Sequence, residues 1–180
     1  MRTALVVVDM QEVLIPVVWK GPELADRIAD LADRARANGV KVIALQQVGG
    51  PMFEPEAPGT RLAQRLRLQP ADTVIRKTAT DGFYRSDLAE ALSEADTVVL
   101  TGVGTDYCVD ATVRAAVSRG FDVILVEDGH STVADPAAGL TAEQIIARHN
   151  RILSNAVHPG GTVTVKAADE IFRGSHRGRH

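Results

Sequence analysis

Short runs of β-branched and other apolar residues alternate with helix-like segments along this chain, and that alternation constrains the possible folds more than any other feature. Most of these runs are too apolar for one face to lie in water, which is typical of strands that are covered on both sides. Six runs have the length and composition of strands: Ala4–Val8, Val40–Leu45, Thr73–Ile75, Thr97–Leu100, Phe121–Val126 and Thr162–Val165.

Helical patterns occupy the intervals between these strands. The segment Pro22–Asn38 starts with a proline, is followed by Gly39 and carries an apolar stripe on one face. Similar patterns fit Ser86–Ala95, Asp106–Arg119 and Thr141–Val157. Because parallel strands are joined by right-handed crossovers, this β-α-β order predicts an α/β fold. We expect a Rossmann-like, doubly wound, mainly parallel six-stranded sheet between helical layers.

Length and composition predict one domain that acts on a small molecule. The 180 residues are 45% hydrophobic, enough for one core, and we place the domain at residues 1–172 and a disordered Gly-, Arg- and His-rich tail at residues 173–180. A net charge of -3 gives no polybasic surface for nucleic acid or membranes. One cysteine cannot form an internal disulfide, and the start of the chain lacks leader features, so we expect a cytoplasmic protein. No apolar run approaches the roughly 20 residues that span a bilayer.

Three residues with reactive side chains follow predicted strands. Asp9 follows Ala4–Val8, Lys77 follows the run that ends at Ile75, and Cys108 follows Thr97–Leu100 after a short turn. Ligands of open α/β sheets collect beyond the carboxyl ends of the strands, so we expect these side chains to meet there. Taken singly, such an aspartate is more often a turn residue, such a lysine is usually solvated, and a lone cysteine is usually a small buried hydrophobe.

The surroundings of Cys108 favour catalysis over a packing role. The residue lies in the first turn of the predicted helix, where free N–H groups and the helix dipole favour a thiolate, so we predict a lowered thiol pKa. Gly102 and Gly104 precede it and allow the backbone to approach a ligand closely. A third glycine, which a dinucleotide-binding loop would need, is replaced by Tyr107, so the chain is not predicted to be a Rossmann dehydrogenase.

Three segments resemble the isochorismatase-like cysteine hydrolases, whose members include nicotinamidases, N-carbamoylsarcosine amidases and streptothricin hydrolases. The segments are Val7–Gln11, Lys77–Phe83 and Leu100–Val109, and the resemblance covers about residues 3–165. It implies that Asp9, Lys77 and Cys108 form a catalytic triad. It also implies a cis peptide between Val103 and Gly104, an oxyanion hole made by the backbone amides of Gly104 and Cys108, and a homo-oligomer.

Departures from the family pattern concern the pocket and the metal site. Leu14 stands where the first family motif usually has phenylalanine, which is expected to reshape the pocket. Nicotinamidase-type members bind a metal through an aspartate and two histidines after the second strand, but residues 45–60 contain no histidine. We therefore expect no metal and no other cofactor. His130 and His149 are expected to be structural.

Five residues are predicted to contact the substrate: Gln11, Trp19, Phe53, Phe83 and Tyr107. Gln11 belongs to the first motif, and the aromatic residues lie in or beside loops at the reactive edge of the sheet, although core packing is equally open for any one of them.

The resemblance implies cleavage of a C–N bond in a small carboxamide, ureide or lactam through an acyl-enzyme on Cys108. The alternative enzyme is an isochorismatase, which cleaves a vinyl ether without an acyl-enzyme. The alternative of another class is a catalytically silent binding module on the same fold, which the presence of all three reactive residues disfavours.

Overall fold

The computed structural model describes residues 2–173. The tail predicted for residues 173–180 lies, apart from Arg173, outside the described residues. Six strands form one parallel sheet: β1 (Thr3–Val8), β2 (Lys41–Gln47), β3 (Thr73–Lys77), β4 (Thr97–Val103), β5 (Asp122–Ser131) and β6 (Val163–Lys166). Their order is β3-β2-β1-β4-β5-β6, which is the doubly wound topology that the sequence predicts. The chain leaves β1 toward one edge and returns to β4 for the other, so the topological switch point lies between these two strands.

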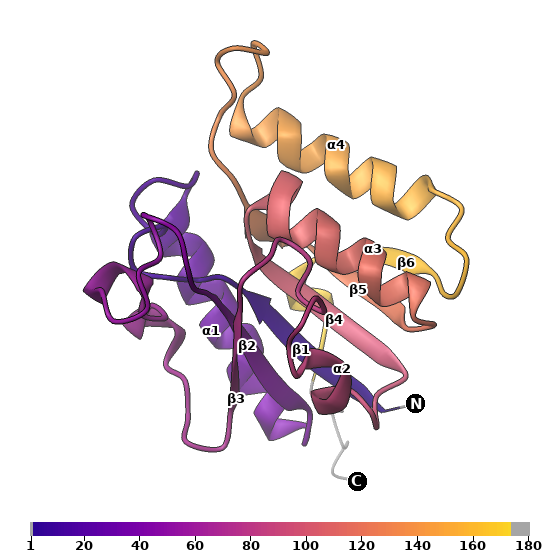
Figure 1. The fold of residues 1–180 in the computed structure, drawn as a ribbon. Helices are drawn as coiled ribbons and strands as arrows, with labels where there is room; N and C mark the ends of the chain where they lie inside the picture. The colour runs from indigo at the N-terminus through magenta and orange to yellow at the C-terminus, as the bar shows by residue number, and fades with distance from the viewer. Residues whose placement is uncertain (1, 174–180) are drawn as a thin grey trace, which may run out of the picture.

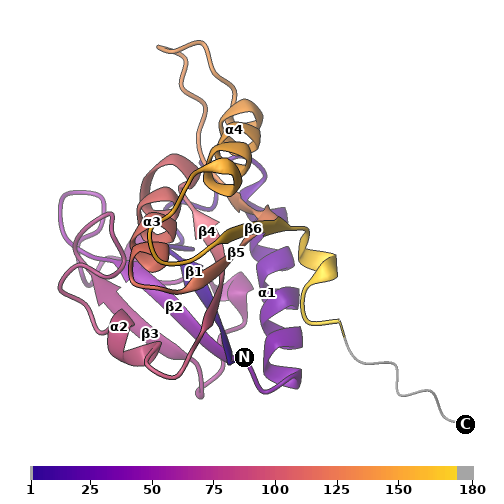
Figure 2. The same cartoon turned by 90° about the vertical axis from the view of Figure 1, so that its right-hand side faces the viewer.

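Helices cover both faces of the sheet. Figure 2 shows α1 (Gly21–Ala37) on one face, and α2 (Leu88–Ala91), α3 (Asp110–Ser118) and α4 (Ala142–Asn155) on the other. Alternate residues of β1 enter the two resulting cores: Leu5 and Val7 pack toward α1, whereas Val6 and Val8 pack toward α3. The strands are apolar on both faces because each face is buried against a helical layer.

Two predicted helices differ from the observed ones. The segment Ser86–Ala95 contains only the four-residue α2, and Asp106–Arg119 divides into a π-helical turn, Thr105–Val109, followed by α3. Strand β5 is longer than predicted and its pairing with β4 is irregular between Leu100 and Gly102. Within residues 2–173, none of the helices has the length and apolarity that crossing a bilayer requires.

The loops after the strands gather at one end of the molecule. Beyond the arrowhead of β1 lie the segments that follow β1 and β2, and the segment between β5 and α4 projects from the same end (Figure 1). Short 3₁₀ turns at Pro58–Thr60 and Gln64–Leu66 lie within the connection from β2 to β3. The fold thus brings these three connections together at the carboxyl ends of the strands.

Candidate active site

The three predicted reactive residues meet at the topological switch point. Asp9 directly follows β1, Lys77 is the last residue of β3, and Cys108 lies in the π-helical turn after β4. The Lys77 ammonium is 2.8 Å from Asp9 Oδ2 and 3.3 Å from Cys108 Sγ. We refer to these residues as the reactive cluster.

Lys77 is the centre of this cluster. Its side chain is buried, and its ammonium also donates to Gln47 Oε1 at 2.7 Å and to the Ala79 carbonyl at 2.9 Å. Three N–H bonds therefore face four acceptors, of which the sulfur is the most distant. The attraction of the ammonium to sulfur strengthens when the thiol loses its proton, so Lys77 can stabilise a thiolate as it forms.

Asp9 is held in a buried turn. Its backbone has a left-handed φ of 50°, a conformation that aspartate tolerates better than most residues, and its N–H donates to the Leu45 carbonyl. Burial raises the pKa of the carboxyl above its usual range, and the charge of Lys77 opposes this shift. Asp9 Oδ1 is buried and has no hydrogen-bond partner among residues 2–173. The carboxylate thus retains a free acceptor atom and an increased affinity for a proton.

The thiol of Cys108 is less acidic than predicted. Burial raises its pKa to about 12, the negative charge of Asp9 adds to the shift, and Lys77 opposes it. The prediction of a lowered pKa is wrong because it considered only the helix start and Lys77, whereas the structure buries the sulfur and places the Asp9 carboxylate close to it. The resting cluster therefore holds a protonated thiol beside a carboxylate that can accept its proton.

Glycines shape the approach to Cys108. Gly102 has a φ of 124°, and a Cβ atom there would lie 2.1 Å from the Val8 carbonyl oxygen, so no other residue fits between β1 and β4. The peptide between Val103 and Gly104 is cis. The Gly104 carbonyl accepts from the N–H groups of Tyr107 and Val109 and thereby begins the turn that carries Cys108.

A cavity of about 550 Å³ opens beside the reactive cluster. It is lined by segments from several loops: Asp9, Leu14, Val17, Val18, Gln47, Met52, Phe53, Thr78, Ala79, Thr80, Val103, Gly104, Tyr107, Cys108, Thr132 and Val133. Of the residues predicted to contact the substrate, Phe53 and Tyr107 line this cavity. Leu14, at the position where the family pattern has phenylalanine, lines it as well.

The other three predicted contacts, Gln11, Trp19 and Phe83, do not line the cavity. Gln11 is buried, where its amide donates to the carbonyls of Gln47 and Thr60 and accepts from the Gln47 N–H, so it joins the loop after β1 to the end of β2. Phe83 belongs to the core and stacks on Phe121 at 6.1 Å. These buried positions exclude both side chains from the cavity lining.

Trp19 lies beside the cavity but does not line it. Its backbone N–H donates to the Thr132 carbonyl, and its backbone carbonyl accepts from the Ser131 hydroxyl at 2.6 Å. Trp19 therefore connects the loop after β1 to the end of β5, so it supports the wall that includes Thr132.

Sequence patterns gave no indication of Gln47, which contacts Lys77 and also lines the cavity. Gln47 pairs with Lys77 in the register of β2 and β3. A polar residue at the end of an apolar strand was too weak a signal to assign a role, because it does not distinguish a partner of a lysine from a solvated side chain.

A buried hydrogen-bonded chain supports the turn that carries Cys108. Thr105 Oγ1 lies 2.8 Å from His130 Nδ1, and His130 Nε2 lies 2.8 Å from Asn150 Oδ1. Because Asn150 Nδ2 donates to the Glu127 carbonyl, its oxygen faces His130, which assigns the ring proton to Nε2. Burial lowers the His130 pKa to about 4, so the ring is neutral and accepts from Thr105. This chain connects the turn to β5 and α4.

The model of the isochorismatase domain matches residues 3–157, which include all three members of the reactive cluster. The chain belongs to the isochorismatase family. This agrees with the resemblance carried by the three sequence motifs.

Similar proteins include two streptothricin hydrolases. A streptothricin hydrolase of Streptomyces noursei is 39% identical in an alignment 143 residues long, which covers 75% of this chain and 56% of that protein. A second streptothricin hydrolase of the same organism is 38% identical and is covered to 51%, so the chain spans about half the length of these curated relatives.

Solved structures support the same fold assignment. A cysteine hydrolase from Pseudomonas syringae pv. phaseolicola has a TM-score of 0.85 at 25% identity, with 95% of this chain and 91% of that chain covered. N-carbamoylsarcosine amidase from Thermoplasma acidophilum has a TM-score of 0.77 at 26% identity, with 95% and 99% covered. The isochorismatase-family fold thus extends over nearly the whole chain.

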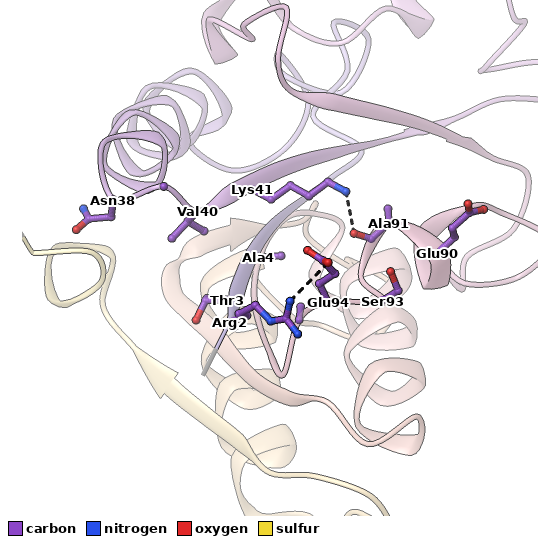
Figure 3. A pocket seen from close by; sticks show the side chains of 12 residues that line it. Arg2, Thr3, Ala4, Asn38, Val40, Lys41, Glu90, Ala91, Ser93 and Glu94 are labelled. Carbon is purple, nitrogen blue, oxygen red and sulfur yellow. Dashed lines mark hydrogen bonds and ion pairs between the residues drawn. The ribbon is translucent and has the colours of Figure 1, made fainter.

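Within residues 2–173, no group of three or more His, Cys, Asp or Glu side chains is arranged to hold a metal ion. A second cavity lies at the opposite end of the sheet, where Lys41 donates to the Ala91 carbonyl and Arg2 pairs with Glu94 at 3.5 Å (Figure 3). None of the predicted site residues lines that second cavity.

Proposed function

We propose that this isochorismatase-family hydrolase cleaves a C–N bond of a small carboxamide, ureide or lactam through a thioester on Cys108. The observation that carries the proposal is the position of the Lys77 ammonium, which contacts both the Asp9 carboxylate and the Cys108 sulfur beside an open cavity. A base, a cation and a nucleophile in mutual contact are the groups that nucleophilic catalysis by a thiol requires. The streptothricin hydrolases and the N-carbamoylsarcosine amidase among the similar proteins support the same reaction class.

In the proposed first half-reaction, the thiol proton passes to Asp9 as the sulfur attacks the carbonyl carbon of the substrate. Asp9 Oδ1 is the available acceptor atom, and burial increases its proton affinity. Lys77 stabilises the sulfur anion during the transfer. The carbonyl oxygen becomes an oxyanion, for which we propose the backbone N–H groups of Gly104 and Cys108 as donors, each worth about 3–4 kcal/mol.

Collapse of this intermediate breaks the C–N bond. The proton held by Asp9 passes to the leaving nitrogen, so that a neutral amine or ammonia departs and the acyl group remains on sulfur. In the second half-reaction Asp9 takes a proton from water as the water oxygen attacks the thioester. The C–S bond then breaks, the sulfur regains the proton, and the carboxylic acid is released.

Substitutions in the reactive cluster test the proposal against vinyl-ether cleavage. Cys108→Ala should abolish turnover of an amide, while Asp9→Asn and Lys77→Ala each reduce it by about a hundredfold or more, because the three groups act as a unit. Cleavage of a vinyl ether needs mainly a proton from Asp9, so that reaction would survive in Cys108→Ala. Intact-mass spectrometry of quenched wild-type reactions should show an acyl adduct on Cys108 with substrates whose deacylation is slow enough to let the adduct accumulate. Near-wild-type turnover by Cys108→Ala would contradict the thioester mechanism.

We also propose that the protein acts on its small-molecule substrate as a cytoplasmic homo-oligomer without a metal or other cofactor. A compartment that keeps thiols reduced suits a mechanism that needs a free Cys108 thiol.

Light scattering should give a mass of at least twice 19.2 kDa, and a monomeric mass would contradict the oligomer. Exhaustive chelation should leave turnover unchanged, whereas a loss reversed by added zinc, iron or manganese would show a metal requirement.

A further inference from the structure

The cavity beside the reactive cluster offers no free charge of either sign. Asp9 is the only charged residue that lines it in the described part of the chain, and its carboxylate is paired with Lys77 at 2.8 Å. Among residues 2–173, no arginine, histidine or glutamate lines the cavity. A ligand carboxylate would therefore have no cationic partner in the cavity, and a ligand cation would have no unpaired anion.

Apolar side chains are exposed at the mouth of the same cavity. Val17 and Met52 are each 58% exposed, Tyr107 is 62% exposed and Val133 is 44% exposed, and all four line the cavity. Residues 2–173 expose nine large apolar side chains, so almost half of them are concentrated at this site. Exposed apolar side chains that gather around a cavity indicate a surface that a ligand covers. We call these four residues the apolar rim.

The polar groups of the lining are neutral. Thr78, Thr80 and Thr132 contribute hydroxyls, of which that of Thr132 already donates to Asp106 at 2.6 Å, outside the lining. Gln47 contributes an amide whose oxygen already accepts from Lys77. Such groups can orient an amide or a ring heteroatom, but they do not compensate for the loss of hydration when a full charge is buried.

We infer that the substrate is uncharged and that its non-reacting part is apolar, so that the site selects neutral amides or lactams over carboxylates and cations of the same shape. This inference rests on the proposed function for the identity of the reacting group. Burial of the non-reacting part against the apolar rim favours binding, whereas an ionised group placed there loses hydration without gaining a partner. Ureido acids and isochorismate, which carry carboxylates, are accordingly disfavoured.

Three probes of equal shape separate the effect of charge from that of size. The probes are 4-nitrobenzamide, 4-carboxybenzamide and 4-amidinobenzamide. Each has a trigonal planar substituent opposite the carboxamide, and at neutral pH this substituent is neutral, anionic and cationic, respectively. Their dissociation constants would be measured by calorimetry on full-length Cys108→Ala protein, which retains the cavity but cannot form the thioester. We expect the neutral compound to bind at least about tenfold more tightly than either charged compound. Equal affinities, tighter binding of a charged compound, or no binding of the neutral one would overturn the inference.

A substitution in the apolar rim provides a second test. Met52→Lys keeps an unbranched side chain of similar length and adds a cation at an exposed position, and Met52→Gln is its neutral control. Made in the Cys108→Ala background, Met52→Lys should tighten binding of 4-carboxybenzamide about fivefold or more relative to Met52→Gln. The same change at Val74, which is 50% exposed on β3 and does not line the cavity, should have no effect. An unchanged affinity in Met52→Lys would overturn the assignment of selectivity to the uncharged rim.

These binding measurements do not depend on turnover. If the neutral probe is preferred but Cys108→Ala protein turns amides over as fast as wild-type protein, the proposed function fails and the charge selectivity stands. If the adduct forms with charged and neutral amides alike, the proposed function stands and the selectivity fails.

Discussion

At the residue scale, the reactive cluster distributes one cation between two groups that would otherwise repel each other as anions. Lys77 contacts the Asp9 carboxylate more closely than the Cys108 sulfur, at 2.8 Å against 3.3 Å. Sulfur is the larger atom, so both contacts are within hydrogen-bond range, and it is burial together with the Asp9 charge that raises the thiol pKa and keeps the sulfur protonated at rest. A thiol protected in this way reacts poorly with unrelated electrophiles, because the thiolate is the nucleophilic form.

This arrangement predicts an unusual response of Cys108 to alkylation. Wild-type protein should react with iodoacetamide more slowly than free cysteine at about pH 8, because its thiol pKa is raised to about 12. Asp9→Asn removes the neighbouring anion and leaves Lys77 free to stabilise the thiolate, so its alkylation rate at that pH should increase about tenfold or more although catalysis is lost. The measurement is the pH dependence of the rate, followed by intact mass. A slower reaction in Asp9→Asn would contradict the assigned direction of the shift.

At the element scale, the π-helical turn that carries Cys108 depends on its neighbours for its position. The chain of hydrogen bonds through Thr105, His130 and Asn150 connects it to β5 and α4, and His130 is buried at the centre of that chain. Protonation of His130 would place a charge in this buried position, so the packing of the turn against β5 and α4 should be sensitive to acid.

We predict that His130 lowers stability in acid. Because burial depresses its folded-state pKa from 6.5 to about 4, the unfolded chain binds more protons in that range, and the stabilisation present above pH 6.5 is lost as pH falls toward 4. The loss attributable to this residue should approach about 3 kcal/mol. It is measured as the difference in slope of unfolding free energy against pH between wild-type protein and His130→Asn. Removing the partly buried His149 by the same substitution is the control, and parallel curves for wild type and His130→Asn would contradict the prediction.

The elements also show how far the sequence determines this structure. All six strands were predictable because parallel strands buried on both faces must be continuously apolar, and the placement of Asp9, Lys77 and Cys108 followed from the strand ends. Side-chain contacts between distant segments were not predictable. Gln11 and Phe83 were assigned to the substrate although tertiary packing buries them. The Cys108 pKa was predicted in the wrong direction because burial of the sulfur and the nearby charge of Asp9 both come from tertiary structure.

At the scale of the whole molecule, the reactive cluster contains a buried ion pair, Asp9 and Lys77, that joins the end of β1 to the end of β3. Both members are almost fully buried, with Lys77 at 1% and Asp9 at 2% exposure. Removing two charges from water is costly, and the mutual attraction of a buried pair often does no more than offset that cost. We therefore expect the pair to add little to the stability of the fold, whatever it contributes to the proposed reaction.

A double-mutant cycle over Asp9 and Lys77 tests this separation of function from stability. Lys77→Met leaves the Asp9 carboxylate buried without its partner and should destabilise the protein by about 3–5 kcal/mol at neutral pH. Asp9→Leu should do the same by leaving the ammonium unpaired, whereas the double variant carries neither charge and should be within about 2 kcal/mol of wild type. The free energies are obtained from urea unfolding, with unchanged m-values as the control for a common unfolding transition. All three variants should be inactive, so recovery of stability without recovery of turnover shows that the pair is kept for chemistry. Additive losses in the double variant would instead show that the two charged side chains stabilise the sheet independently of each other.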